Sequence, residues 1–147
     1  MTFPEPNLFI PKNFDIIHKG EKILDFLPTT LRDDDKIKLF YALDTEFLKP
    51  QFGLQILIRN CQENINLDPK SALYCILLTR EFKDFIRDQL FHAENAGMGF
   101  DISMLHQTTF VMSLQGYNDS FERFMEFFNS KLEPYLNYRN KTRFEDL

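Results

Sequence analysis

Apolar and polar positions alternate in four short stretches of the chain. Apolar residues recur at every second position in "KIKLFYAL" (36–43) and "GLQILIRNC" (53–61). The same period of two is found in "GFDISMLHQ" (99–107) and "TTFVMSLQG" (108–116). This alternation predicts half-buried β-strands, because successive side chains of a strand point to opposite faces. We expect the first two strands to pair as an antiparallel hairpin with a long connection, and the last two to form a second hairpin.

Apolar residues with helical spacing fill the long stretch 67–97 between the two strand pairs. Asp68 is a good N-cap, and Pro69 stands at the first helical position, where its missing N–H does no harm. Gly97 marks the end of the helix, because glycine adopts the left-handed conformation at little cost. The predicted buried stripe follows a three-and-four spacing and consists of Leu78, Phe82, Phe85, Ile86, Gln89, Leu90 and Ala93.

A second helix is predicted after Gly116. Asp119 or Ser120 can cap its start, and Pro134 is expected to close it. Its apolar stripe consists of Phe121, Phe124, Met125, Phe128 and Leu132. The order of elements is therefore ββαββα, which is typical of an α+β fold with an antiparallel sheet packed by two helices.

The first 35 residues lack this regularity. "FPEPNLFIPKNFD" (3–15) contains three prolines, and "KGEKILDFLPTTLRDDD" (19–35) adds a glycine, a fourth proline and three adjacent aspartates. Each proline removes a backbone donor and biases the preceding residue toward an extended form. The segment also holds too many apolar residues for a free linker. We therefore predict an extended connector, or strap, over residues 1–35 and a folded domain over residues 36–147.

Composition and charge exclude several classes of protein. The formal net charge of -5 argues against nucleic acid as a partner, since phosphate binding needs a basic surface. The apolar runs are far shorter than the roughly 20 residues that span a bilayer, so no membrane partner is expected. Cys61 and Cys75 are too few for a disulfide framework, and no signal peptide is visible, which indicates a cytoplasmic protein. Seventeen Phe and no Trp predict a core or an interface rich in aromatic rings.

The stretch "FHAENAGMGFD" (91–101) superficially resembles a zinc-binding helix. An H-E-x-x-H motif starting at His92 would need Glu at position 93 and His at position 96, where this chain has alanine. The inverted motif H-x-x-E-H fails at positions 95 and 96 in the same way. His18 and His106 also stand alone, and neither a nucleophile elbow nor a glycine-rich phosphate loop is present. The sequence therefore predicts no catalytic residue and no metal ligand.

Three ordered stretches resemble the insulinase-type (inverzincin) zinc metallopeptidases, the family of insulin-degrading enzyme. They are "PNLFIPKNFDI" (6–16), "LFYALDTEFLKPQFGL" (39–54), and 91–121, which runs from "FHAENAGMGFDI" to "SLQGYNDSF". Asn95 departs from the family, which usually has an apolar residue there. The residues that carry the resemblance are Phe9, Pro11, Phe14, Pro50, Ala96, Gly97, Gly116, Tyr117, Asn118 and Asp119.

The resemblance implies a place in a larger enzyme. Such peptidases consist of four related α+β domains that form a closed chamber, with zinc and the H-x-x-E-H motif in the first domain. By resemblance, residues 36–147 are the first part of the middle (third) domain, and the family continues with further helices beyond "KTRFEDL" (141–147). The chain would then hold no zinc and show no activity alone. Its expected partners are the remaining domains, in cis or in trans, and peptide substrates, with the substrate-binding residues left open.

A second hypothesis comes from a different class of protein. The Phe-rich helix could instead make the chain a stand-alone interaction module that docks a partner through exposed rings. The two hypotheses differ in exposure. A truncated chamber domain should leave a large apolar face uncovered and associate, whereas a stand-alone module should be monodisperse by light scattering.

Overall fold

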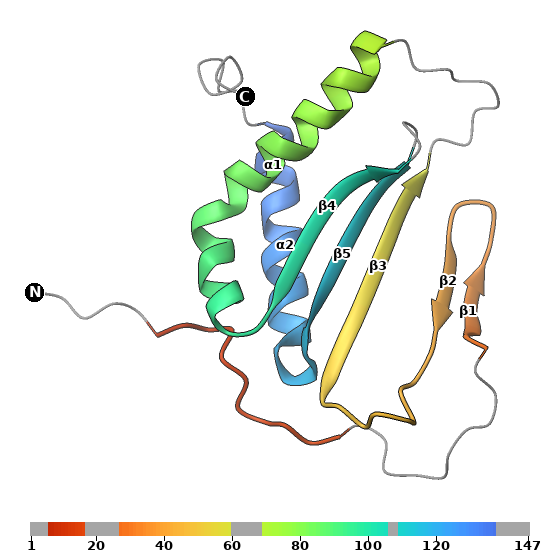
Figure 1. The fold of residues 1–147 in the computed structure, drawn as a ribbon, viewed down its shortest axis with the longest axis vertical. Helices are drawn as coiled ribbons and strands as arrows, with labels where there is room; N and C mark the ends of the chain where they lie inside the picture. The colour runs from red at the N-terminus through yellow and green to blue at the C-terminus, as the bar shows by residue number, and fades with distance from the viewer. Residues whose placement is uncertain (1–5, 17–26, 60–68, 106–108, 138–147) are drawn as a thin grey trace, which may run out of the picture. The chain divides into compact units, whose positions relative to one another are not determined.

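The computed structural model describes residues 6–16, 27–59, 69–105 and 109–137. The chain divides into two compact units. One comprises Phe14–Pro50, and the other combines Met1–Asn13 with Gln51–Leu147. Figure 1 shows a β-hairpin in the first unit and a sheet with two helices in the second.

The unit Phe14–Pro50 contains a hairpin of strands β1 (Thr29–Asp33) and β2 (Lys38–Tyr41), which pair antiparallel. The adjacent aspartates form its turn. Asp34 Oδ1 accepts hydrogen bonds from the backbone N–H groups of Lys36 and Ile37, at 2.9 and 2.8 Å. Short acidic side chains favour such turns because they bond to backbone amides nearby.

The predicted hairpin between 36–43 and 53–61 is wrong. Strand β2 pairs with β1, whereas β3 (Gln51–Arg59) pairs with β5 (Thr109–Tyr117), more than fifty positions downstream. Strand β1 lies within the stretch predicted to be connector, where the neighbouring proline and aspartates conceal its short pattern. The division of the chain at residue 35 stays a prediction.

The second unit is built on a three-stranded antiparallel sheet in the order β3-β5-β4, with β4 at Gly99–Leu105. Strands β3 and β4 both run antiparallel to β5 and hence parallel to each other. Helix α1 (Pro69–Asn95) connects them, so β3-α1-β4 is a split β-α-β unit with β5 inserted between its strands (Figure 1). A 3-10 helix, η1 (Asn118–Ser120), leads into α2 (Phe121–Leu136). The predicted α+β class and the hairpin of β4 with β5 are confirmed.

The two faces of this sheet differ. Along β5, Met112 and Leu114 are buried, and their neighbours in register include Ile56 on β3 and Phe100 on β4. Phe100 contacts Phe82 of α1 and Phe128 of α2, so both helices pack on this face. The alternate residues of each strand point to the opposite face. We call this opposite face the open face, because neither α1 nor α2 packs on it.

Helix α1 begins at Pro69, as predicted, while the proposed cap Asp68 lies outside the described residues. Its core stripe is confirmed at Phe82, Ile86, Leu90 and Ala93, with Phe85 partly buried and Thr79 buried as well. The stripe is wrong at Leu78 and Gln89, which are exposed. Both residues lie at the edge of the helix face that packs on the sheet. They fit the three-and-four spacing of the stripe, but their side chains are exposed to solvent.

Gly97 ends α1 as predicted, with φ +80°. The N–H of Gly97 donates to the carbonyl of Glu94 at 2.9 Å, and the N–H of Met98 donates to the carbonyl of Ala93 at 3.0 Å. This pair of bonds is the Schellman motif, which satisfies carbonyls that the helix leaves open.

Helix α2 buries Phe124 and Phe128 in the core. The prediction that Pro134 closes this helix is wrong, because the helix continues through it to Leu136. A proline near the last turn removes only one donor there, and the N–H of Asn137 still reaches the carbonyl of Pro134 at 3.2 Å. Ser120 is the N-cap, as one of the two predicted candidates, but its hydroxyl makes no capping hydrogen bond.

No helix among the described residues is apolar enough over a sufficient length to cross a membrane.

Candidate functional site: the anchored segment and the open face

Residues 6–13, which we call the anchored segment, are attached to the ends of both helices. The ring of Phe9 lies edge-on to Phe124 and Phe127 of α2, with centroids 5.8 and 5.6 Å apart. Edge-to-face pairs of this kind add to the hydrophobic contribution of burial. The segment thus inserts a ring into the neighbouring core, while the extended strap over residues 1–35 stays a prediction.

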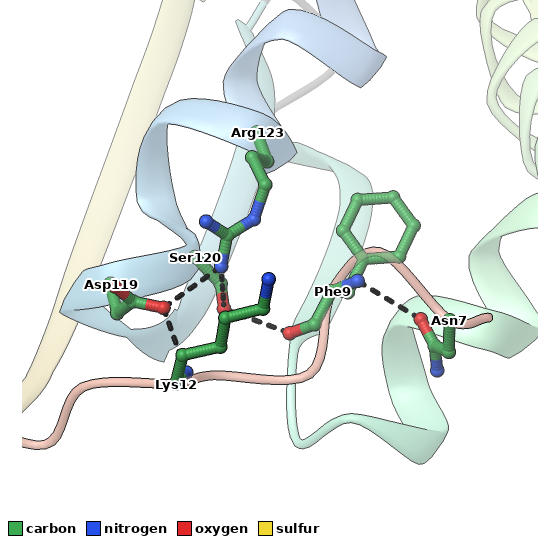
Figure 2. A network of polar contacts seen from close by, with 6 residues as sticks. All are labelled: Asn7, Phe9, Lys12, Asp119, Ser120 and Arg123. Carbon is green, nitrogen blue, oxygen red and sulfur yellow. Dashed lines mark hydrogen bonds and ion pairs between the residues drawn. The ribbon is translucent and has the colours of Figure 1, made fainter.

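Three polar contacts fix the backbone around Phe9, and Figure 2 draws those with Ser120 and Asn7. The Ser120 hydroxyl donates to the Phe9 carbonyl at 2.8 Å, and the Phe9 N–H donates to Asn7 Oδ1 at 3.0 Å. The Asn7 amide also donates to the carbonyl of His92 at 2.6 Å, near the end of α1. Because Ser120 bonds to the anchored segment, its hydroxyl is not used to cap α2.

Asp119 joins the anchored segment to α2 electrostatically. Its Oδ2 accepts a hydrogen bond from the Lys12 N–H at 2.9 Å and from Arg123 Nη2 at 2.9 Å (Figure 2). The Lys12 backbone amide and, next, the Arg123 guanidinium hold the pKa of Asp119 below its ordinary value. The carboxylate is therefore stabilised in the charged form that both donors require.

Tyr135 links the two helices from the other end of α2. Its hydroxyl donates to the carbonyl of Leu78 at 3.1 Å and lies 3.3 Å from Glu81 Oε2 on α1. Burial, and then the negative charge of Glu81, raise the pKa of Tyr135. The phenol thus remains protonated and available as a donor.

Two groups of the residues that carry the family resemblance, which we call landmarks, lie side by side. One is Ala96 and Gly97, and the other is Gly116 to Asp119. A Cβ at Gly97 would come within 2.9 Å of Cε2 of Tyr117, and a Cβ at Gly116 would collide with Sδ of Met98. Ala96, beside Gly97, is buried. Asn118 follows in η1 as the next residue of the second group. The turn after α1 and the end of β5 therefore interlock through glycines.

The remaining landmarks are more dispersed. Phe9 is anchored as described, and Pro11 is half-buried in the same segment. Phe14, which belongs to the other unit, has 55% of its surface exposed. Pro50 is half-buried and directly precedes β3. The structure thus brings together the landmarks near residues 9, 97 and 117, while Phe14 and Pro50 belong to the other unit.

Sequence reasoning missed three of the anchoring residues. Asn7 and Arg123 act through side-chain bonds, and Lys12 acts through its backbone amide. Arg123 follows Asp119 by four positions, a spacing that signals an ion pair on a helix. No comparable signal in the sequence connects Asn7 with His92, which lies 85 positions away.

The histidines give no metal site within the described residues. His92 lies on α1, and the described ranges contain no group of three or more His, Cys, Asp or Glu side chains that could hold an ion. His18, His106 and Cys61 lie outside the described residues, while Cys75 is a half-buried free thiol. The residues described do not fit a zinc ion.

The open face carries a shallow hollow of about 500 Å³. Gln55, Ser113 and Asp101 form one row across the three strands, and Leu57 and Val111 continue the face toward the next row. Lys83 of α1 reaches Asp101 at 2.7 Å and partly neutralises it. The face thus combines amide, hydroxyl and aliphatic groups.

Comparisons with known proteins agree with one another. A family described as "Middle or third domain of peptidase_M16" matches residues 1–147. Insulin-degrading enzyme-like 2 of Arabidopsis thaliana is 29% identical over 126 residues, which are 86% of this chain and 12% of that protein. Insulin-degrading enzyme-like 1, peroxisomal, from the same plant is 28% identical with the same coverage. The crystal structure of pitrilysin matches 99% of this chain and 15% of its own, with a TM-score of 0.74 at 21% identity, so it shows the same fold.

Proposed function

Because this chain belongs to the family of middle domains of M16 peptidases, we propose that it is a non-catalytic fragment or subunit of an insulinase-like zinc metalloendopeptidase. In this role it forms part of the wall of the chamber that holds the peptide substrate. The chain spans 12% of the length of the curated relatives. Its partners are therefore the remaining domains of a peptidase, in cis or in trans.

The open face of the sheet is the observation that carries this proposal. Both helices lie on the opposite face, so a nine-residue strand, β3, and its two neighbours present their side chains without a helical cover. The mixture of Gln55, Ser113 and Leu57 suits a peptide of variable sequence, because amides and hydroxyls can bond to its backbone while aliphatic groups contact its side chains. Such a surface holds a substrate without reacting with it.

Hydrolysis would depend on a domain that this chain does not contain. A bound zinc ion supplies an activated water in peptidases of this kind. The described residues do not fit zinc, so we assign no catalytic or metal-binding role to any residue of the chain. We also retain the cytoplasm as the proposed location, which cell fractionation tests.

The alternative of a stand-alone module rests on exposed phenylalanines in α2. Phe124 and Phe128 are buried in the core, and Phe127 packs against Phe9. The ring centroids of Phe121 and of Phe52 on β3 lie 4.7 Å apart. Phe124 and Phe128 of the predicted stripe therefore stabilise the fold itself, whereas Phe121 and Leu132 are 38% and 42% exposed. We favour the chamber-wall function because the two most buried rings are not available to a partner.

Nuclear magnetic resonance with the isotope-labelled chain tests this proposal. On addition of an unstructured peptide, we expect the largest amide shifts at Gln55, Ser113 and Gln115. Shifts concentrated on α2 would support the interaction module instead. In parallel, the chain with zinc and a fluorogenic peptide should show no chelator-sensitive turnover, and sustained turnover would overturn the non-catalytic role.

A further inference from the structure

A second depression, on the helical face of the sheet, lies between β3 and α2. It is a groove of about 340 Å³. Ile56, Met112 and Leu114 of the sheet line it, together with Met125, Phe128 and Leu132 of α2. Its lining is apolar except for Glu126 and Asn129 at the rim.

The apolar surface continues beyond this groove at the C-terminal ends of β3 and α2. Ile58 lies two residues after Ile56 on the same side of β3 and is 55% exposed. Leu132 of α2 is 42% exposed, and Leu136, one turn further, is 70% exposed. Helix α1 packs mainly against β4, at the opposite edge of the sheet from β3. Within the unit that holds the sheet, the described apolar side chains at this end of β3 and α2 are therefore partly exposed.

A row of acidic residues borders the groove on α2. Glu122, Glu126 and Glu133 are spaced by four and seven positions and so share one face of the helix. None of the ion pairs found among the described residues involves them. Like charges four positions apart on a helix repel each other and destabilise it. A cationic partner beside this row would turn that cost into an attraction.

The position of the groove indicates what kind of element fits it. It lies in the same layer as α1 and α2, on the face of the sheet that helices cover. A helix has a diameter of about 10 Å, which is the width of roughly two strand spacings. A third helix alongside α2 would thus cover β3 and complete the layer.

We infer that this groove docks an amphipathic helix from outside residues 1–147, with an apolar stripe against Ile56, Met125 and Leu132 and a border of lysine or arginine facing Glu122, Glu126 and Glu133. The apolar stripe provides the burial, and the charges fix which way round the helix lies. Such a docking surface is needed whether or not the open face contacts peptide, so the two proposals fail independently.

A synthetic helical peptide of leucine and lysine, with its lysines along one border, is the probe. Fluorescence anisotropy measures its binding to the 147-residue chain, and a leucine–glutamate peptide with the same pattern is the comparison. We expect the lysine peptide to bind at least about tenfold more tightly than the glutamate peptide. The double substitution Glu126→Lys with Glu133→Lys should weaken the binding of the lysine peptide by about tenfold or more.

Matched variants distinguish binding at this groove from non-specific attraction of a cationic peptide to an acidic protein. Asp88→Lys with Glu94→Lys changes the net charge equally on exposed positions of α1 and should leave binding within about twofold. Leu132→Asp should abolish binding, whereas Leu73→Asp, on an exposed position of α1, should not. Circular dichroism confirms that each variant is folded.

Three results would overturn the inference. They are the absence of binding to the unsubstituted chain, equal binding of both peptides, and equal weakening by the α1 and α2 charge reversals.

Discussion

The backbone of Gly97 lies against the ring of Tyr117, so close that a Cβ at position 97 would come within 2.9 Å of Cε2. Gly97 ends α1, and Tyr117 ends β5, so the contact joins two segments that are separated by the whole β4–β5 hairpin. Met98 and Gly116 form a second contact of the same kind beside it. Two glycines thus let the end of the helix and the end of the central strand approach each other.

Gly97→Ala should destabilise the protein by roughly 2 kcal/mol, because a left-handed residue with a Cβ is strained and the added methyl meets the Tyr117 ring. The melting temperature should fall by several degrees, which differential scanning calorimetry measures. Gly53→Ala on β3 is the matched control, because a Cβ there meets nothing within 4 Å. Equal losses from both substitutions would contradict the role given to Gly97.

Ser120→Ala should weaken the attachment of the anchored segment. Ser120 is fully buried, and its hydroxyl donates to the Phe9 carbonyl and accepts from Arg123 Nη2 at 3.2 Å. The substitution removes both hydrogen bonds at a cost of about 1 to 2 kcal/mol. The effect should be local as well as global. Hydrogen exchange should show faster exchange at the Phe9 and Lys12 amides than in the parent protein, and unchanged rates there would count against this contact.

Phe124→Ala should cost about 3 to 5 kcal/mol, because the ring is completely buried between Phe9 and Phe128 and its loss leaves a cavity. Urea denaturation measures the change in the free energy of unfolding. Phe91→Ala on α1 removes the same ring where 60% of it is exposed, and it should change stability by less than about 0.5 kcal/mol. A comparable loss at both positions would show that Phe124 is not a core residue.

Asp119→Asn should reduce the dependence of stability on pH in acid. The folded state lowers the pKa of Asp119 below its ordinary value, chiefly through the Lys12 backbone amide, so the unfolded state binds the proton more readily. The stabilisation is fully present above the ordinary pKa and is lost as the pH falls through the lowered value in the folded protein. Melting temperatures from pH 6 downward should therefore decrease less steeply in the variant. Asp88→Asn, which removes a charge from exposed α1, should retain the slope of the parent protein.

Local patterns predicted the second unit well. The alternation in 99–107 and 108–116 corresponds to β4 and β5, and the helix expected over 67–97 ends at Gly97 with the hydrogen bonds of its motif. The landmark residues of the family resemblance were also visible in the chain. These features depend on neighbours within a few positions, so the sequence carries them directly.

The pairing of strands could not be read in the same way. Ile56 on β3 is as compatible with a neighbouring hairpin as with Met112 of β5, its actual partner. Likewise, nothing local indicates that the Asn7 amide reaches His92 or that Asp119 receives the Lys12 amide. Each of these contacts joins residues far apart in the chain, and only burial of the shared core selects them.

The sequence by itself determined the α+β composition, the limits of the helix ending at Gly97, the lack of a zinc motif and the likeness to insulinase-type peptidases. Only the tertiary structure decided that β5 lies between β3 and β4, that Phe9 is inserted beside Phe124, and that a groove with an acidic border remains beside α2. The physical reason is the distance along the chain over which each kind of interaction acts. Helix ends and strand periodicity arise from short-range sterics and hydrogen bonds, whereas strand order and uncovered surfaces arise from how distant apolar residues exclude water together.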